Sequence, residues 1–256
     1  MYELVGLIPA AGQARRLAQL PCSKEIFPVG FINCQNGDRE ECCPKPVSLY
    51  LIERLRRAEV KRAFMILNKE KCDIIRYYGN GTQFGLSLAY LIQEKPLGMP
   101  DAINQAYPWI KSQTVLFGMP DTIFYPEDAY SILLDNHRQT GADLTLGLFP
   151  TNKPERFGMV SYDQNYSLIY TIDKPVQTQL KYMWGIGCWK FTFTEFLMEE
   201  IRELIPRREE TILGDIFQAA MEAGLAVKVV PFEQGEYIDI GNLEDLTHAI
   251  QDYSRQ

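Results

Sequence analysis

Short apolar runs and amphipathic helical patterns alternate through the first half of this 256-residue chain. Apolar runs of this length are typical of buried strands, and the stretches between them repeat with the period of a helix. The expected order is strand 4–8, helix 46–60, strand 63–67, helix 71–78, strand 86–92, helix 100–106 and strand 114–118. This alternation predicts a doubly wound, mainly parallel α/β sheet flanked by helices.

The second half of the chain is richer in strands. After a helical stretch at 129–139, strands are expected at 143–149, 157–162, 168–172, 184–191, 227–231 and 237–240, and helices at 194–204, at 211–223 and from Leu243 onward. No internal repeat or low-complexity segment is visible in the sequence. We therefore expect one domain over residues 1–256, with both halves built onto the same sheet.

Two stretches of the first half allow more specific predictions about solvent exposure. Residues 30–45 are polar, mixed in charge and free of apolar periodicity, which indicates a surface loop or insertion. The helix that follows has an apolar stripe, and its arginines are expected on the opposite, solvated face. The stripe consists of Val47, Leu51, Ile52 and Leu55, and the arginines are Arg54, Arg56 and Arg57.

Charge and hydropathy exclude several classes of partner. The net charge of −7 argues against a nucleic-acid partner, because such a partner requires a basic face. No apolar run approaches the roughly 20 residues that a membrane helix needs, and the N-terminus lacks the pattern of a signal peptide. We expect a cytoplasmic protein without a membrane partner. Homo-oligomer formation is left open.

The chain contains six cysteines, at positions 22, 34, 42, 43, 72 and 188. In a cytosolic protein they are expected to be reduced thiols. Two alternatives are a zinc knuckle built from the first four and redox sensing by the vicinal pair Cys42 and Cys43. The usual C-x2-C spacing of structural zinc sites is missing.

The loop after the first strand combines small residues with cations. Ala10, Ala11 and Gly12 come first, and Arg16 and Lys24 follow. Backbone N–H groups of small residues can approach a phosphate closely, and cations neutralise its charge. The Gly-Lys-Ser/Thr of a P-loop and the G-x-G-x-x-G of dinucleotide-binding proteins are both absent. On these residues alone, a phosphate-binding loop and an ordinary turn are both open.

The ends of this stretch resemble the signature of the sugar nucleotidylyltransferases. Arg16-Leu17, then the run of residues 23–29 with sequence SKEIFPV, is similar to that family's G-x-G-x-R-L loop followed by a lysine and Leu/Phe-Pro-Val. The resemblance implies the nucleotide-diphospho-sugar transferase fold, with a nucleotide-binding half at about 1–125 and a sugar-binding half at about 126–256. The chain departs from the signature at Gln13-Ala14-Arg15, which replaces the usual second glycine and threonine.

Further matches follow in the family's order, within or just after expected strands. Gln93 and Gly98 resemble the family's base-reading glutamine and glycine, although Pro100 and Asp101 depart from the pattern that follows. The other matching segments are 119–124 with sequence MPDTIF, 155–160 with ERFGMV, 173–175 with DKP, and 237–241 with YIDIG. An apolar strand ending in an acid, as at Asp239, also requires a partner or a metal for its carboxylate.

The resemblance implies a role for each of these residues. Arg16, Lys24 and Lys174 would contact the reacting phosphates; Ala10, Ala11, Gly12, Gln93, Gly98 and Asp121 would bind the nucleotide; Gly158, Asp173, Lys174 and Tyr237 would bind the sugar; and Asp121 and Asp239 would hold Mg²⁺. Carboxylates that hold Mg²⁺ offset the repulsion between two phosphate groups.

The predicted reaction joins a nucleoside triphosphate and a sugar 1-phosphate to give a nucleotide sugar and pyrophosphate. Gln93 favours a pyrimidine base, hence UTP or dTTP, and glucose 1-phosphate is the sugar that the resemblance implies. Three alternatives remain: a non-catalytic nucleotide sensor, a transferase acting on a non-sugar phosphate such as phosphocholine, and a Rossmann-like oxidoreductase. The last would require the missing dinucleotide fingerprint.

Overall fold

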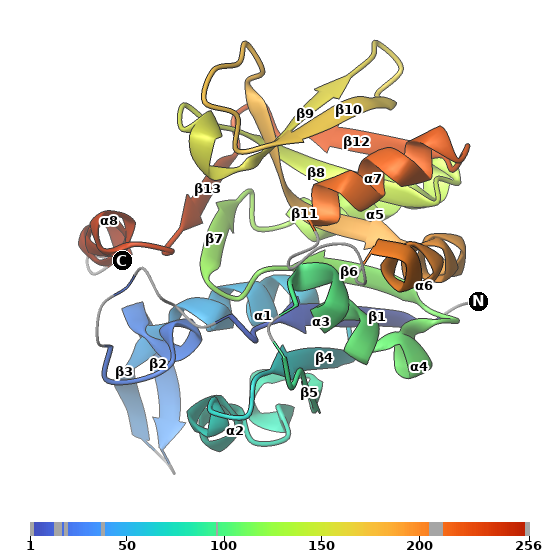
Figure 1. The fold of residues 1–256 in the computed structure, drawn as a ribbon. Coiled ribbons are helices and arrows are strands. Elements are labelled where there is room, and N and C mark those ends of the chain that lie inside the picture. The colour runs from blue at the N-terminus through green and yellow to red at the C-terminus, as the bar shows by residue number, and fades with distance from the viewer. Residues whose placement is uncertain are drawn as a thin grey trace.

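The structure is a computed structural model that describes residues 3–12, 17, 20–36, 39–95, 97–204 and 212–253. Within these residues, nine strands form one sheet in which seven run in the order β10-β9-β11-β6-β1-β4-β5, while β8 branches from β11 and pairs with β12 (Figure 1). The first-half strands are β1 (Leu4–Pro9), β4 (Arg62–Leu67), β5 (Ser87–Ile92) and β6 (Thr114–Gly118). All of them are parallel, as predicted.

The second-half strands extend this sheet with mixed pairing. They are β8 (Leu144–Pro150), β9 (Gly158–Tyr162), β10 (Leu168–Asp173), β11 (Tyr182–Trp189) and β12 (Val227–Pro231). Strand β11 runs antiparallel to β6 on one side and to β8 on the other, and so joins the two halves of the chain. The predicted doubly wound mixed sheet is confirmed.

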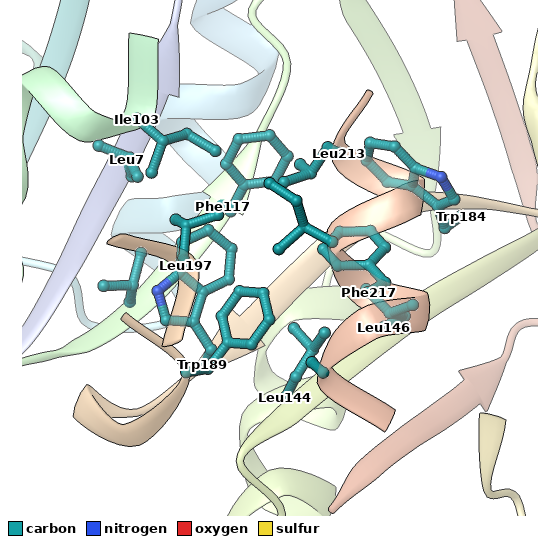
Figure 2. Packing of buried hydrophobic residues seen from close by; sticks show 14 of the residues in the cluster. Leu7, Ile103, Phe117, Leu144, Leu146, Trp184, Trp189, Leu197, Leu213 and Phe217 are labelled. Atoms are coloured by element: carbon teal, nitrogen blue, oxygen red, sulfur yellow. The ribbon is translucent and has the colours of Figure 1, made fainter. Parts of the chain in front are cut away.

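Helices cover both faces of the sheet. One face carries α3 (Met99–Gln105), α4 (Tyr107–Ile110), α6 (Phe191–Leu204) and α7 (Leu213–Glu222), and the other carries α1 (Val47–Arg57), α2 (Cys72–Tyr78) and α5 (Ala129–Thr140). Leu7 of β1 packs in the first core and its neighbour Ile8 packs in the second. Figure 2 shows the first core, where Phe117 and Trp189 lie among Leu197 and Phe217. Burial on both faces explains the uninterrupted apolar run of β1.

A smaller pair of strands stands apart from the main sheet. Strand β7 (Thr122–Tyr125) pairs antiparallel with β13 (Glu236–Asp239), and α8 (Leu243–Tyr253) follows β13. Val47 of α1, Ile123 of β7 and Leu246 of α8 share a third apolar cluster. This cluster attaches the C-terminal helix to the first half of the chain (Figure 1).

The expected surface loop at 30–45 has regular structure. Strands β2 (Pro28–Asn36) and β3 (Arg39–Pro46) form an antiparallel hairpin that projects from the body of the molecule (Figure 1). Most of its described side chains are at least partly exposed, and 52% of the Phe31 surface is accessible. The base of the hairpin packs against the body of the molecule, with Val29 in the third apolar cluster, but most of the ribbon is open to solvent. It therefore needs no alternating apolar pattern, and its strands leave little trace in the sequence.

Arg54 was expected on the solvated face of α1, and that prediction is wrong. Only 3% of Arg54 is exposed, and its guanidinium lies against the ring of Phe124 with Nε donating to the Phe124 carbonyl at 2.9 Å. The carbonyls of Phe124 and Tyr50 replace the water that an exposed arginine would bind. Arg56 and Arg57 are exposed as predicted.

Three short 3₁₀ helices complete the described elements: η1 (Lys24–Ile26), η2 (Thr82–Phe84) and η3 (Pro154–Arg156). No helix in the described ranges is both long and apolar enough to span a bilayer. All six cysteines are free thiols, and the described residues contain no group of three His, Cys, Asp or Glu side chains arranged to hold a metal. The zinc-knuckle alternative therefore finds no support in this part of the chain.

Candidate active site

A cavity of about 560 Å³ opens at the carboxyl ends of the parallel strands. Ala11 and Gly12 reach it from the loop after β1, Gln93 from the end of β5, and Asp121 from the loop after β6. Its opposite wall comes from the second half: Arg156, Phe157, Gly158, Asp173, Lys174, Met183, Trp184, Tyr237, Asp239 and Gly241. This edge is where open α/β sheets bind ligands.

The predicted phosphate loop lies at one end of this cavity. Ala11 and Gly12 line it, whereas Ala10 lies just behind them, only 2% exposed, with its N–H donating to the Ile66 carbonyl of β4 at 2.7 Å. Ala10 is therefore part of the loop's support and does not face the cavity. The predicted Arg16, together with Gln13-Ala14-Arg15, lies outside the described residues.

The predicted base-binding residues form a second corner. Gln93 is buried, and its Nε2 donates to the Gly98 carbonyl at 3.1 Å and to Oδ2 of Asp101 at 2.8 Å. Gly98 has φ = 94°, a conformation in which other residues are strained. Asp101, which departs from the family pattern, thus orients the glutamine beside it.

The two predicted metal-binding acids come together although 118 positions separate them in sequence. The β7–β13 pairing places Asp239 opposite Thr122, and the Ile240 N–H donates to the Asp121 carbonyl at 3.1 Å. Both carboxylates line the cavity. Burial, and then the neighbouring Asp121 carboxylate, raise the pKa of Asp239 to about 6.

Two cations offset these acids. The Lys24 ammonium forms an ion pair with Asp121. Burial is the largest single effect and opposes its charge, but Asp121, Glu25 and Asp239 together outweigh it, so the pKa of Lys24 lies above its usual value. Arg156 places Nη2 3.6 Å from Oδ2 of Asp239 and pairs through Nη1 with Asp245. Lys24 is thus at the point where the acids converge.

The predicted sugar-binding residues form the far wall. A Cβ on Gly158 would stand 2.2 Å from the Trp184 indole nitrogen, so only glycine fits beside that ring. Lys174 has φ = 46°, and its Nζ, 3.3 Å from Asp173, belongs to a side chain that is 55% exposed. Tyr237 packs its ring against Phe149 while lining the cavity. All four predicted sugar residues therefore contribute to one wall.

The chemistry of the acid pair fits Mg²⁺. Mg²⁺ in phosphate-transfer sites is usually held by one or two carboxylates together with substrate phosphates, and not by a complete protein cage. Asp121 and Asp239 provide two such ligands. Burial and then the neighbouring Asp121 carboxylate raise the pKa of Asp239, and a divalent cation would offset both effects. The residues present therefore match the expected metal.

Four residues at or behind the cavity were given no role by the sequence: Glu25, Lys71, Arg156 and Asp245. Glu25 lines the cavity and is paired with the buried Lys71 at 2.6 Å, and Arg156 joins Asp239 to Asp245. The sequence motifs include Glu25 and Arg156, but their partners lie far away in the sequence: Lys71 is 46 positions from Glu25, and Asp245 is 89 positions from Arg156. Of these residues, only Asp245 could have been noticed from the sequence. It follows Asn242 by three positions, a spacing typical of a pair that caps the start of a helix.

Comparisons with known proteins agree with this geometry. The family model described as "Nucleotidyl transferase" matches residues 39–256. The chain is 27% identical over 250 residues to a glucose-1-phosphate thymidylyltransferase of Neisseria meningitidis, covering 95% of this chain and 80% of that protein. It is 25% identical over 215 residues to a mannose-1-phosphate guanylyltransferase of Mycobacterium tuberculosis, covering 82% and 56%.

Solved structures show the same fold. A crystal structure from Bacillus anthracis, described as a glucose-1-phosphate thymidylyltransferase in complex with a sucrose, superposes with a TM-score of 0.82 at 21% identity. The match covers 98% of this chain and 95% of that one. The expected nucleotide-diphospho-sugar transferase fold is confirmed.

Proposed function

Because the chain belongs to the nucleotidyl transferase family, we propose that it joins UTP or dTTP to a sugar 1-phosphate, with glucose 1-phosphate as the first candidate, and releases pyrophosphate. One observation carries the proposal. Asp121 and Asp239 converge in a single cavity with Lys24, opposite Lys174. This combination of acids and cations suits a site where two phosphate groups must be brought together.

In the proposed reaction, an oxygen of the sugar phosphate attacks the α-phosphorus in line. The new P–O bond forms as the bond from the α-phosphorus to the oxygen of the leaving pyrophosphate breaks. The attacking phosphate is already an anion, so positioning and charge stabilisation supply the catalysis and no strong general base is required. Mg²⁺ held by Asp121 and Asp239 would neutralise phosphate charge when bound.

Each of three cationic side chains would contact a different phosphate group. Lys24, now paired with Asp121, would contact the α-phosphate, and the partly exposed Lys174 would hold the incoming sugar phosphate. Arg16, outside the described residues, is proposed to contact the departing pyrophosphate. Ala11 and Gly12 would offer backbone N–H groups to the triphosphate.

The orientation of Gln93 supports a base with an N–H group on its pairing edge. Both N–H bonds of its amide are directed at Gly98 and Asp101, so the oxygen Oε1 is what remains for a ligand, and it can only accept. Uracil and thymine present a ring N–H at that edge, and so does guanine, whereas cytosine and adenine present an acceptor ring nitrogen there and could donate to Oε1 only through their amino groups. Uracil and thymine are the pyrimidines that fit. The thymidylyltransferase relatives favour the same choice.

The experiment is a matrix of nucleoside triphosphates against phosphorylated acceptors. ATP, CTP, GTP, UTP and dTTP are each combined, in MgCl₂, with glucose, galactose and mannose 1-phosphates and with phosphocholine, and pyrophosphate release is measured. We expect the highest kcat/KM with glucose 1-phosphate and UTP or dTTP. Turnover only with phosphocholine would change the acceptor, and no release with any pair would leave the nucleotide-sensor alternative.

A further inference from the structure

Two successive carbonyl groups of the phosphate loop are held from behind by side chains that do not line the cavity. The Lys71 ammonium donates to the Ala10 carbonyl at 2.6 Å, and Nδ2 of Asn68 donates to the Ala11 carbonyl at 2.9 Å. Both donors belong to the segment that connects β4 to α2. The loop lacks the second glycine of its relatives' signature, so its peptide orientation needs another source.

The held carbonyls determine where the loop's N–H groups point. In a trans peptide the C=O and N–H bonds point in opposite directions, so a carbonyl held toward Lys71 turns the N–H of Ala11 the other way. The same reasoning applies to the Ala11 carbonyl and the N–H of Gly12. Ala11 and Gly12 are the loop residues that line the cavity, so these two N–H groups are aimed at the place proposed for the triphosphate.

The same segment also holds the chain on both sides of Lys24. Lys71 donates to Oε1 of Glu25 at 2.6 Å, and both residues are buried, at 7% and 1% exposure. Asp73, in the first turn of α2, accepts from the Ser23 N–H and from the Ser23 hydroxyl, each at 2.7 Å. The phosphate loop and the residues flanking Lys24 are therefore attached to one support.

We propose that Lys71 and Asn68 are positioning residues for the nucleotide's phosphates: they orient the N–H groups of Ala11 and Gly12, and Lys71 joins that loop to the segment that carries Lys24. The inference rests on the proposed function, since it assigns the phosphates to this end of the cavity. It predicts that the support affects the nucleotide and not the sugar phosphate, whose wall comes from the second half of the chain.

The test uses variants that remove the donors without leaving a buried charge. Lys71→Met combined with Glu25→Gln removes the bond to Ala10 and keeps the buried pair neutral, and Asn68→Ala removes the bond to Ala11. Binding of MgUTP and MgdTTP is measured by calorimetry without a sugar phosphate, and KM for both substrates is measured with the best pair from the matrix. We expect nucleotide binding to weaken about tenfold in the double variant and about threefold in Asn68→Ala. KM for the sugar phosphate should change less than about twofold.

Lys69→Met is the matched control, because Lys69 is an exposed lysine of the same segment. Thermal melting of each variant reports any general loss of stability, which would raise KM for both substrates alike. The positioning role alone would be overturned if the wild type binds nucleotide and the variants bind it as tightly. It would also be overturned if the variants weaken binding of the nucleotide and of the sugar phosphate to the same extent. Wild-type protein that binds no nucleotide and releases no pyrophosphate would overturn the proposed function, and the inference with it.

Discussion

Asp101 restricts what Gln93 can offer to a ligand. Its carboxylate accepts one N–H of the Gln93 amide while Gly98 accepts the other, so rotation of the amide would place an oxygen against two acceptors. A glutamine whose amide orientation is fixed in this way can bind only ligands with a matching hydrogen-bonding pattern. A ligand that leaves a polar group unpaired in a buried site loses more binding free energy than one hydrogen bond contributes. We therefore propose that base selection in this chain depends on Asp101, a residue that departs from the family pattern.

Asp101→Ala should therefore relax discrimination against CTP. Without the carboxylate, the amide can turn and donate to an acceptor nitrogen, and we expect the ratio of kcat/KM for UTP or dTTP to that for CTP to fall about tenfold. Steady-state kinetics with competing nucleotides measures the ratio. Glu94→Ala, which removes an exposed acid next to Gln93, serves as the control. An unchanged ratio in Asp101→Ala would show that the glutamine is held by other means.

The acid pair gives a second prediction at this scale. Asp121→Asn or Asp239→Asn should each reduce kcat at least about a hundredfold, because a ligand for the divalent cation is lost. Folding should not suffer, since each substitution removes one of two partly buried carboxylates that repel each other. Melting curves with and without MgCl₂ supply the second readout: the rise in melting temperature on adding Mg²⁺ should disappear. Asp135→Asn, an exposed acid on α5, is the control, and near-native turnover in both active-site variants would refute the metal assignment.

At the scale of elements, α1 and β7 are joined by one buried cation. Arg54 contributes Nε to the Phe124 carbonyl and Nη1 to the Tyr50 carbonyl at 3.0 Å, and its guanidinium lies 5.3 Å from the Tyr125 ring centre. No acid pairs with it among the residues the structure describes. Backbone carbonyls and aromatic faces therefore stabilise its charge. Because β7 begins directly after Asp121, this contact also supports the active site.

Arg54→Met should lower the free energy of unfolding by about 2 kcal/mol, since it leaves the Phe124 carbonyl buried without a donor. Urea titration followed by circular dichroism measures the change. Arg56→Met, an exposed arginine on the same helix, should change it by less than about 0.5 kcal/mol. Equal effects of the two substitutions would mean that the buried contacts of Arg54 add nothing to stability.

The elements that could be predicted are those whose sequence pattern follows from burial. Strand β1 is apolar throughout because both of its faces are covered, and α1 shows a stripe because one side packs on the sheet. Strand β7 could not be predicted, because its four residues become a strand only through β13, more than 100 positions later. The hairpin β2–β3 was not predicted for the opposite reason: most of it is open to solvent, so its strands lack a regular apolar pattern.

The same distinction applies to the site. Gln93 and Asp121 follow parallel strands of the sheet and could be assigned to one edge from the strand order, and the family resemblance added Asp239 to the same cavity. The contacts of Lys71 with Ala10 and Glu25 could not be predicted, because a lysine in a polar turn normally points to solvent. Side-chain support from distant segments is the part of a site that only three-dimensional structure supplies.

At the scale of the whole molecule, β11 makes the two halves of the chain parts of one sheet. It pairs with β6 of the first half through Ile186–Trp189 and with β8 along Tyr182–Trp189. The cavity lies where the halves meet, so its acids come one from each half: Asp121 after β6, Asp239 at the end of β13. We propose that neither half forms the site alone, in line with the expected division at about residue 125.

Stability of the whole chain should depend on pH through His137. This histidine of α5 is 6% exposed, and its Nδ1 forms a hydrogen bond with the Thr145 hydroxyl of β8. Burial lowers its pKa from 6.5 to about 4. The positive charges of Lys190 and Arg138 act in the same direction, and the carboxylate of Asp143 opposes them in part. The unfolded chain then binds the extra proton between these values, so the contribution of His137 is complete above pH 6.5 and is lost as the pH falls to 4, by up to about 3 kcal/mol. Asp239, with its raised pKa, acts in the opposite direction in part of this window, so the difference between wild type and His137→Gln is the quantity to measure, by urea titration at several pH values. That difference should grow steadily from pH 4 to 6.5. A flat difference would mean that His137 accepts its proton in the folded protein as readily as in the unfolded chain.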